Sequence, residues 1–336
     1  MKNTSPNKKL ILISFPVILL IGIYFLGPAP EKPKFNPAMP SVPLEANELE
    51  RYVANQESKH KLKPNNEARI VWADSSKKKT EYAVVYIHGF FACQEEGNPA
   101  HRNFAKKFGC NMYLARMADH GIDTVDQLIN FTADRWWESG KEALAIGKAL
   151  GEKVILMSTS TGGTVALMLA AQYPQDVFAL VNMSPNIAVN HPLAWIGNNP
   201  WGLQIARMVV GGKSSVSQLD STIAKYWYSS YRMEAVTQLE EMLEDKMTKE
   251  TFQHITCPSL TLYYYKNELE QDPQIKVSAM LEMNQQLATP SDMKEAIAIP
   301  NAGGHVIGCA LRSKDLPSVE NAIEKFAVEK LKMSRK

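Results

Sequence analysis

The chain has 336 residues, of which 45% are apolar, and its 37 basic and 35 acidic side chains leave a net charge of +2. This apolar fraction is sufficient for a globular protein with a large core. The near balance of charges argues against nucleic acid or a strongly charged molecule as the partner. Roughly 280 residues follow the N-terminal segments, which suits one large α/β domain or two small ones.

The N-terminus carries a targeting pattern. Lys2, Lys8 and Lys9 precede the uncharged run from Leu10 to Leu26, so residues 1–30 are expected to be a signal anchor or a signal peptide. Prolines surround the only small residue that could precede a cleavage site, which favours an uncleaved transmembrane anchor. The lysines then keep the N-terminus in the cytoplasm and put the body outside, in a bacterial periplasm or at the cell exterior. Cleavage would make the protein secreted.

Residues 31–66 are expected to hold a proline-rich tether and one helix, at 44–58, before a domain that spans 67–334. In that domain apolar runs predict strands at 69–73, 82–87, 111–115, 153–157, 177–183, 259–265 and 295–299. Helical spacing follows at 99–108, 132–150, 163–172, 275–287 and 318–330. This alternation predicts an α/β fold with a doubly wound, mostly parallel sheet. The alternation is interrupted at about 186–250, where Trp, Tyr and Met are frequent, and a helical cap over an apolar pocket is expected there.

The stretch from Lys153 to Ala170 is the main candidate for chemistry. Its strand and its helix are joined by Ser158-Thr159-Ser160-Thr161-Gly162-Gly163, which matches the G-x-S-x-G turn that presents a serine nucleophile at its apex. Ser160 is the apex, and the elbow glycines Gly162 and Gly163 allow strand and helix to pass closely. Ser158 stands where the pattern has glycine. An ordinary βα turn is the alternative.

Two backbone N–H groups are candidates for an oxyanion hole. The strand at 82–87 ends in His88-Gly89, and the N–H of the next residue, Phe90, can pair with the N–H of Thr161, which follows the nucleophile. His88 is interpreted as a residue that shapes this loop. The adjacent Asp119 and His120 point apart on an extended loop and are interpreted as structural.

An acid and a base follow Ser160 in chain order. His305, behind two glycines after the last strand, is the candidate base that activates the serine hydroxyl. The acid that orients His305 is expected in the loop at 268–272, where Asp272 is preferred and Glu268 is the alternative. All three candidates follow strands, and active sites of open α/β sheets lie at the carboxyl ends of strands.

These motifs resemble the α/β-hydrolase superfamily. The runs Y-I-H-G-F (86–90), R-M-A-D-H-G (116–121), S-T-S-T-G-G (158–163) and N-A-G-G-H-V (301–306) are similar to those of the monoglyceride lipase, lysophospholipase and serine aminopeptidase group. The resemblance implies a cap inserted after the sixth strand of that fold. It also implies hydrolysis of a small-molecule or lipid ester through an acyl-enzyme, with no metal and no organic cofactor. A peptidase or amidase, or a binding protein that has lost catalysis, are the alternatives.

Four cysteines, Cys93, Cys110, Cys257 and Cys309, would permit two disulfides in an exported protein. Cys93–Cys110 is the first pairing to expect, because it would close one loop. Four buried thiols are the alternative. The oligomeric state is not predicted from the sequence.

Overall fold

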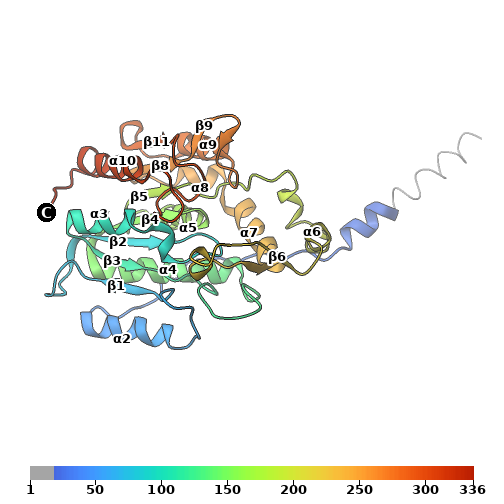
Figure 1. Cartoon of the computed structure of the whole chain (residues 1–336), viewed down its shortest axis with the longest axis horizontal. Coiled ribbons are helices and arrows are strands. Elements are labelled where there is room, and N and C mark those ends of the chain that lie inside the picture. Colours follow the sequence, from blue (N-terminus) through green and yellow to red (C-terminus); the bar gives the residue numbers. More distant parts are fainter. Residues whose placement is uncertain (1–18) are drawn as a thin grey trace, which may run out of the picture.

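The computed structural model describes residues 19–336, which are built around one seven-stranded sheet (Figure 1). Its strands are β1 (Arg69–Val71), β2 (Thr80–Ile87), β3 (Asn111–Leu114), β4 (Gly151–Thr159), β5 (Val177–Met183), β8 (Ser259–Tyr263) and β11 (Lys294–Ala298), in the order β1-β3-β2-β4-β5-β8-β11. Only β1 runs antiparallel to its neighbour. The predicted mostly parallel, doubly wound sheet is confirmed.

The central strands contain continuous apolar runs, such as Ala83–Ile87 in β2 and Val154–Met157 in β4, because both faces of the sheet are covered there. In β4, Val154 and Leu156 belong to one buried cluster, whereas Ile155 and Met157 belong to the other. Side chains alternate between the two faces of a strand, so a single apolar run supplies two cores.

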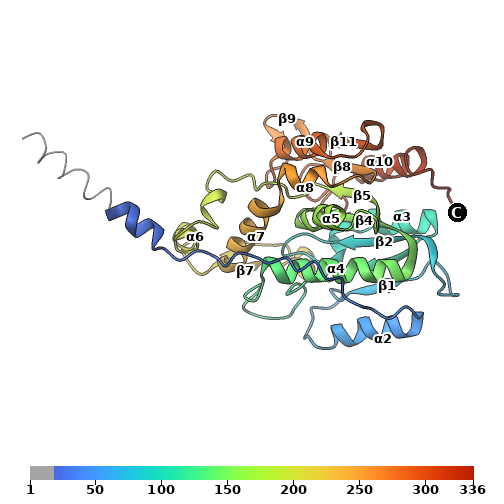
Figure 2. The same ribbon diagram turned by 180° about the vertical axis from the view of Figure 1, so that it is seen from behind.

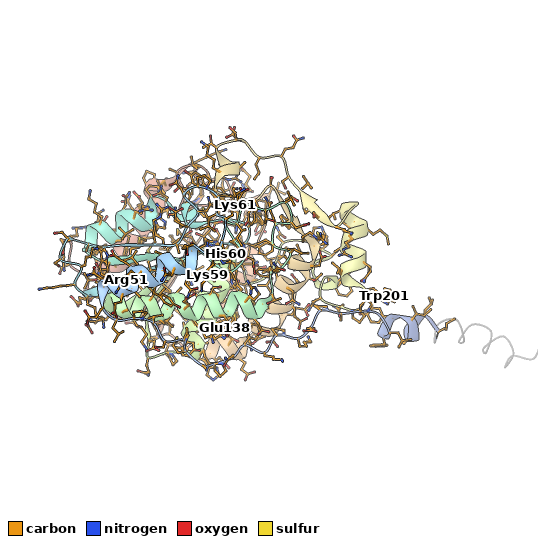
Figure 3. All side chains as sticks on the ribbon, turned by 90° about the horizontal axis from the view of Figure 1, so that it is seen from below. Arg51, Lys59, His60, Lys61, Glu138 and Trp201 are labelled. Carbon is orange, nitrogen blue, oxygen red and sulfur yellow. The ribbon has the colours of Figure 1, made fainter. Side chains whose placement is uncertain are left out.

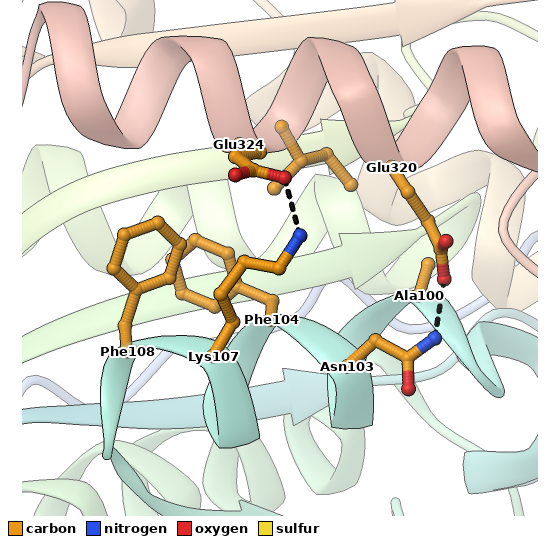
Figure 4. A pocket seen from close by; sticks show the side chains of 8 residues that line it. Ala100, Asn103, Phe104, Lys107, Phe108, Glu320 and Glu324 are labelled. Carbon is orange, nitrogen blue, oxygen red and sulfur yellow. Dashed lines mark hydrogen bonds and ion pairs between the residues drawn. The ribbon is translucent and has the colours of Figure 1, made fainter. Parts of the chain in front are cut away.

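Helices cover both faces. α4 (Ala133–Leu150), α5 (Thr161–Gln172) and α9 (Val277–Gln286) pack on one face, and α3 (Ala100–Phe108) and α10 (Leu316–Glu329) on the other. Figure 4 shows how α3 meets α10. Phe104 and Phe108 fill the gap between the two helices, Lys107 pairs with Glu324, and Asn103 Nδ2 donates to Glu320 at 2.7 Å.

A cap is inserted between β5 and β8. It comprises α6 (Gly202–Val210), a two-stranded sheet of β6 (Ser214–Val216) and β7 (Ser230–Arg232), and α7 (Met233–Lys246), and the short α8 (Lys249–Gln253) leads back to β8. The cap is mainly helical, as expected, but the β6–β7 pair was not predicted because each strand has only three residues. The strand before the cap is fifth in chain order in this sheet.

The proline-rich segment lies against the body. Residues 28–43, called the strap below, run along α4 to α2 (Ala46–Glu57), as Figure 2 shows. The N–H groups of Lys34 and Phe35 donate to Asp134 Oδ1 at 2.9 and 2.7 Å. The fully buried Lys141 donates to the carbonyl of Ala38 at 2.7 Å. Because these contacts repeat along α4, the strap is part of the folded domain.

The N-terminal end of the strap meets the cap at Trp201. The N–H of Trp201 donates to the carbonyl of Pro28 at 2.9 Å, and its indole Nε1 donates to the carbonyl of Ile23 at 3.0 Å (Figure 3). Residues 19–25 are helical. Most of the predicted anchor lies outside the described residues, and no helix within residues 19–336 is long and apolar enough to cross a membrane.

The four cysteines are buried free thiols, so the predicted Cys93–Cys110 disulfide is wrong. Cys93 follows β2 at the carboxyl edge of the sheet, whereas Cys110 precedes the parallel strand β3 at the opposite edge. The nine residues of α3 carry the chain back between them. That helix is about 13 Å long, about twice the Cα separation that a disulfide bridges. Burial raises the pKa of each of these two thiols to about 12.

Candidate active site

Ser160 occupies a strained turn between β4 and α5. Its backbone has φ of 53° and ψ of −124°, a combination that L-residues rarely adopt outside functional sites. The turn is closed by the N–H of Gly163, which donates to the carbonyl of Ser160 at 2.8 Å. A Cβ on Gly162 would lie 2.1 Å from the carbonyl oxygen of Ile87, and one on Gly163 would lie 2.5 Å from Cβ of Pro185. Both glycines are therefore required by close backbone packing.

Ser158 fits beneath the turn in place of glycine. Its side chain is fully buried, and Oγ donates to Asn182 Oδ1 at 2.7 Å. The hydroxyl group of Ser158 therefore pairs with the amide oxygen of the buried Asn182 on the neighbouring strand β5, which a glycine at this position could not do.

The structure brings Asp272 and His305 together. His305 Nδ1 lies 2.7 Å from Asp272 Oδ2, and both side chains are buried. The other carboxylate oxygen, Oδ1, accepts from the N–H groups of Gln274 and Ile275 at 2.9 and 3.0 Å. Since the carboxylate can only accept, Nδ1 is the donor, and the lone pair of the imidazole is on Nε2. That nitrogen has no hydrogen-bond partner among the described residues.

Glu268 does not reach His305. It lies at the exposed tip of a hairpin made by β9 (Tyr265–Asn267) and β10 (Glu270–Gln271), where Tyr265 Oη donates to it at 2.9 Å. The residues between the end of β8 and Asp272 form this hairpin. The hairpin brings the chain back to β8, where the N–H of Asp272 donates to the carbonyl of Tyr264 at 3.0 Å.

Phe90 and Thr161 are the two candidate residues for an oxyanion hole. Both border the same cavity as Ser160 and His305. Thr161 is the first residue of α5, so its N–H has no acceptor within the helix. Among the backbone hydrogen bonds of the described residues, the N–H of Phe90 has no acceptor either. Two unpaired N–H groups next to a serine can stabilise a developing negative charge.

Two buried histidines hold the loop that carries Phe90. His88 Nε2 accepts from the N–H of Met117 at 3.0 Å, and His120 Nε2 accepts from the N–H of Phe91 at 2.9 Å. Burial lowers the pKa of His120 to about 3 and that of His88 well below its usual value, so both rings are neutral and can accept. His88 shapes the loop as predicted. The hydrogen bond by which His120 supports the loop at Phe91 was not predicted, although His120 belongs to the run at 116–121 that resembles the hydrolases.

Asp119 does not act with His120. Its carboxylate pairs with Arg135 through Nε at 2.8 Å and Nη2 at 2.9 Å. The adjacent pair therefore has two separate structural roles, as the sequence indicated.

Glu96 also lies at the site, although it was not predicted from the sequence. It lies in the short turn after β2, is 2% exposed, and accepts a hydrogen bond from the N–H of Gly89. Burial raises its pKa to about 7. A Cβ on Gly89 would lie 2.8 Å from Cβ of Ser160 and 3.0 Å from Oε2 of Glu96, so this carboxyl group lies next to the serine. Nothing in the run Gln94-Glu95-Glu96 distinguishes the buried Glu96 from the half-buried Glu95.

Ser160 opens into a cavity of about 460 Å³ beneath the cap, called the Ser160 cavity below. A second, mainly apolar cavity of about 290 Å³ lies within the cap and is called the cap cavity. Five residues border both: Val189, His191, Tyr231, Val236 and Leu239. The two cavities are therefore adjacent. Among residues 19–336, no group of three or more His, Cys, Asp or Glu side chains is arranged to hold a metal ion.

No protein-family model and no curated protein matches the sequence. Solved structures do match the fold. One comes from work on LipS and LipT, two metagenome-derived lipolytic enzymes; it is 16% identical, with 79% of this chain and 99% of that chain aligned and a TM-score of 0.63.

Two monoglyceride lipases match similarly. The monoacylglycerol lipase of Paleococcus ferrophilus is 15% identical over 78% of this chain and 97% of its own, with a TM-score of 0.56. The monoglyceride lipase of Saccharomyces cerevisiae is 13% identical over 80% and 92%, with a TM-score of 0.57. The chain therefore has the α/β-hydrolase fold, which these lipases share.

Proposed function

We propose that the protein is a serine hydrolase that cleaves carboxylic esters through an acyl-enzyme on Ser160. The observation that carries the proposal is the hydrogen bond between Asp272 and His305, which leaves Nε2 of His305 without a partner in the cavity that contains the strained Ser160. In this arrangement Asp272 is the acid of the triad, and the exposed Glu268 is not.

In the proposed reaction, His305 Nε2 removes the proton from Ser160 as Oγ attacks the ester carbonyl carbon. The oxyanion that forms accepts from the N–H groups of Phe90 and Thr161. The tetrahedral intermediate collapses, the bond to the leaving alcohol breaks, and His305 donates its proton to that alcohol. Water then attacks the acyl carbon while His305 Nε2 removes its proton; the bond between the acyl carbon and Ser160 Oγ breaks, His305 returns the proton to Oγ, and the carboxylic acid leaves. The Oγ–Nε2 hydrogen bond is absent in this structure, and such bonds often tighten only when substrate binds.

The cap cavity suits the acyl half of the substrate. It is lined mainly by aliphatic side chains, including Leu193, Ile205, Val209 and Val236. An acyl chain in the cap cavity would reach the serine past the residues that border both cavities. Burial of each methylene group contributes about 0.8 kcal/mol, so we expect kcat/KM to rise with acyl-chain length until the cavity is filled. A peptidase or amidase on this scaffold gives no such dependence.

A fluorophosphonate probe tests the proposal directly. The wild-type protein should be labelled, and Ser160→Ala should not be. Ser217 also borders the Ser160 cavity, so Ser217→Ala is the matched control and should be labelled like the wild type. Absence of labelling in the wild type, or equal labelling of Ser160→Ala, would show that the protein is not a serine hydrolase and would leave a binding protein of the same fold.

We also propose that the N-terminal segment holds the protein at a membrane, with the body outside the cytoplasm. The exposed apolar residues at 19–21 and 23–26 continue the uncharged run of the sequence and emerge beside the cap. The cap adds the exposed side chains of Trp195, Met208, Val209 and Val216. If this is correct, the protein resists alkaline extraction from membranes and is digested by protease added to spheroplasts. Release by alkali, or complete protection, would refute it.

A further inference from the structure

The cap cavity is mainly apolar, but one carboxyl group borders it. Glu240 is the only acidic side chain among the described residues that line this cavity. It is half-buried, and within residues 19–336 no group forms a hydrogen bond or an ion pair with its carboxyl group. Burial, and then repulsion from Glu244, raise the pKa of Glu240 to about 7, whereas the charge of Lys276 lowers it. A ligand group that donates to this carboxylate would therefore supply a missing partner.

The helix α7 directs Glu240 toward the cap cavity. Met233, Val236 and Glu240 follow one another at intervals of three and four residues, so they lie on one face of α7. All three line the cap cavity. The next residue, Glu241, lies on a different face, where it is 1% exposed and pairs with Lys32 of the strap at 2.6 Å. Two adjacent glutamates therefore have different surroundings, one at the strap and one at the cavity.

Glu240 lies in the part of the cap cavity that does not adjoin the Ser160 cavity. On α7, Val236 and Leu239 border both cavities, whereas Glu240 borders the cap cavity alone. Gly197, which also lines only the cap cavity, lies beside it: a Cβ on Gly197 would be 3.7 Å from Cβ of Glu240. An acyl chain that extends from Ser160 into the cap cavity therefore passes the shared residues first. Only its distal end reaches Glu240.

The chemistry at this end of the cavity favours a hydroxyl group. A methyl group beside Glu240 would displace water from the carboxylate without replacing its hydrogen bonds, which costs free energy. A hydroxyl group would donate to the carboxylate, and a hydrogen bond to a charged group contributes more than one between neutral groups. A protonated amine would also pair with the carboxylate, but removing a second charge from water costs more than removing a hydroxyl group.

We propose that Glu240 determines acyl specificity, by accepting a hydrogen bond from a hydroxyl group at the distal end of the acyl chain. The preferred substrates are then esters of fatty acids whose chain ends in a hydroxyl group. This inference rests on the proposed function, because it concerns the acyl half of the same ester. A site that can pair with a hydroxyl group discriminates against an analogue that lacks it, because the polar group of the site is then left unpaired.

Three pairs of p-nitrophenyl esters test the proposal. In each pair a methyl group replaces the terminal hydroxyl group: 6-hydroxyhexanoate with heptanoate, 8-hydroxyoctanoate with nonanoate, and 10-hydroxydecanoate with undecanoate. The ratio of the two kcat/KM values is measured for each pair at pH 8, where Glu240 is mostly charged. For at least one pair, the full-length wild-type protein should prefer the hydroxy ester by about threefold or more. Smaller ratios in all three pairs would overturn the proposal without any variant.

Glu240→Leu separates recognition of the hydroxyl group from support of the cap. Leucine fills a similar space but cannot accept, so the hydroxyl group would be buried without a partner. For the preferred pair, kcat/KM of the hydroxy ester should fall, and its ratio to that of the alkyl ester should fall about tenfold or more. An unchanged ratio would show that Glu240 does not contact the hydroxyl group. A ratio that falls only because the alkyl ester improves would also overturn the proposal.

Asp245→Asn is the matched control, because it removes a negative charge from the same helix at an exposed position that borders neither cavity. Its ratio should equal that of the wild type, and a fall as large as in Glu240→Leu would overturn the proposal. Fluorophosphonate titration gives the fraction of active molecules in each preparation. If the wild type cleaves none of the esters, or Ser160→Ala cleaves them at the wild-type rate, the proposed function fails and this inference fails with it. Preference of an active wild type for the alkyl ester in every pair overturns this inference alone.

Discussion

Asp272→Asn is the substitution that most sharply tests how Asp272 and His305 work together. Asp272 is fully buried, and its Oδ1 is fixed by two backbone N–H donors, from Gln274 and Ile275. In the variant the amide oxygen must occupy this position, because an NH₂ group there would face two donors. The amide nitrogen is then placed where Oδ2 was, 2.7 Å from Nδ1 of His305.

This exchange reverses the polarity of the hydrogen bond. An amide NH₂ can only donate, so Nδ1 must accept, and the proton of the neutral imidazole moves to Nε2. The lone pair that should take the proton of Ser160 is lost, while the fold and the cavity stay the same. In Ser-His-Asp hydrolases the wrong tautomer lowers kcat by about four orders of magnitude, which corresponds to about 5.5 kcal/mol of transition-state stabilisation.

The assay is kcat for p-nitrophenyl butyrate at pH 8, with thermal unfolding to confirm that each variant folds. Asp272→Asn should lose about 10⁴ in kcat. Glu268→Gln removes a carboxylate from the exposed hairpin and should leave kcat within about twofold, because exposed charges that far from the site contribute little. If Asp272→Asn keeps a tenth of the activity, or if Glu268→Gln loses as much as Asp272→Asn, Asp272 is not the acid that orients His305.

Three further predictions concern the scaffold. Gly162→Ala puts a Cβ 2.1 Å from the carbonyl oxygen of Ile87 and should lower the free energy of unfolding by several kcal/mol. Gly212→Ala is the control, because no atom lies within 4 Å of its Cβ, and it should leave the free energy of unfolding unchanged. Equal urea midpoints for the two variants would contradict the predicted clash at Gly162. Burial lowers the pKa of His101 to about 3, so between pH 7 and 5 only the unfolded chain binds a proton at this residue. His101 alone should therefore lower the stability by about 2 kcal/mol on acidification, in addition to the losses from His88 and His120. A His101→Gln variant should lose about 2 kcal/mol less than the wild type over this range, and an equal loss would exclude this cause. Lys141→Met removes the side chain that donates to the carbonyl of Ala38 in the strap and should speed hydrogen exchange of the backbone amides at residues 34–38. Unchanged exchange rates would show that the other contacts of the strap are sufficient to hold it against α4.

Local patterns were sufficient for the central strands of the main sheet and for the shape of the turn at Ser160. The strands β2, β3, β4, β5 and β8 contain short apolar runs, which a sheet covered on both faces requires, so their positions follow from the residues. The turn at Ser160 is likewise a local requirement, because a strand and a helix can pass at that distance only with Gly162 and Gly163 between them. His305 was found from its place after the last strand, since parallel strands end at one edge of the sheet.

Other features depend on long-range packing. The choice between Asp272 and Glu268 depends on a hairpin that directs one carboxylate inward and the other into solvent. The sequence contains no signal for this, because β9 and β10 are only three and two residues long.

The same holds for Glu96 and Glu95, which are identical neighbours in the sequence but differ in burial once the turn packs on Gly89. The turn that presents Ser160 is therefore determined by a few adjacent residues, at 158–163. Which carboxylates lie at the site depends on contacts between residues that are far apart in the chain, because burial and hydrogen-bond partners are properties of the folded molecule.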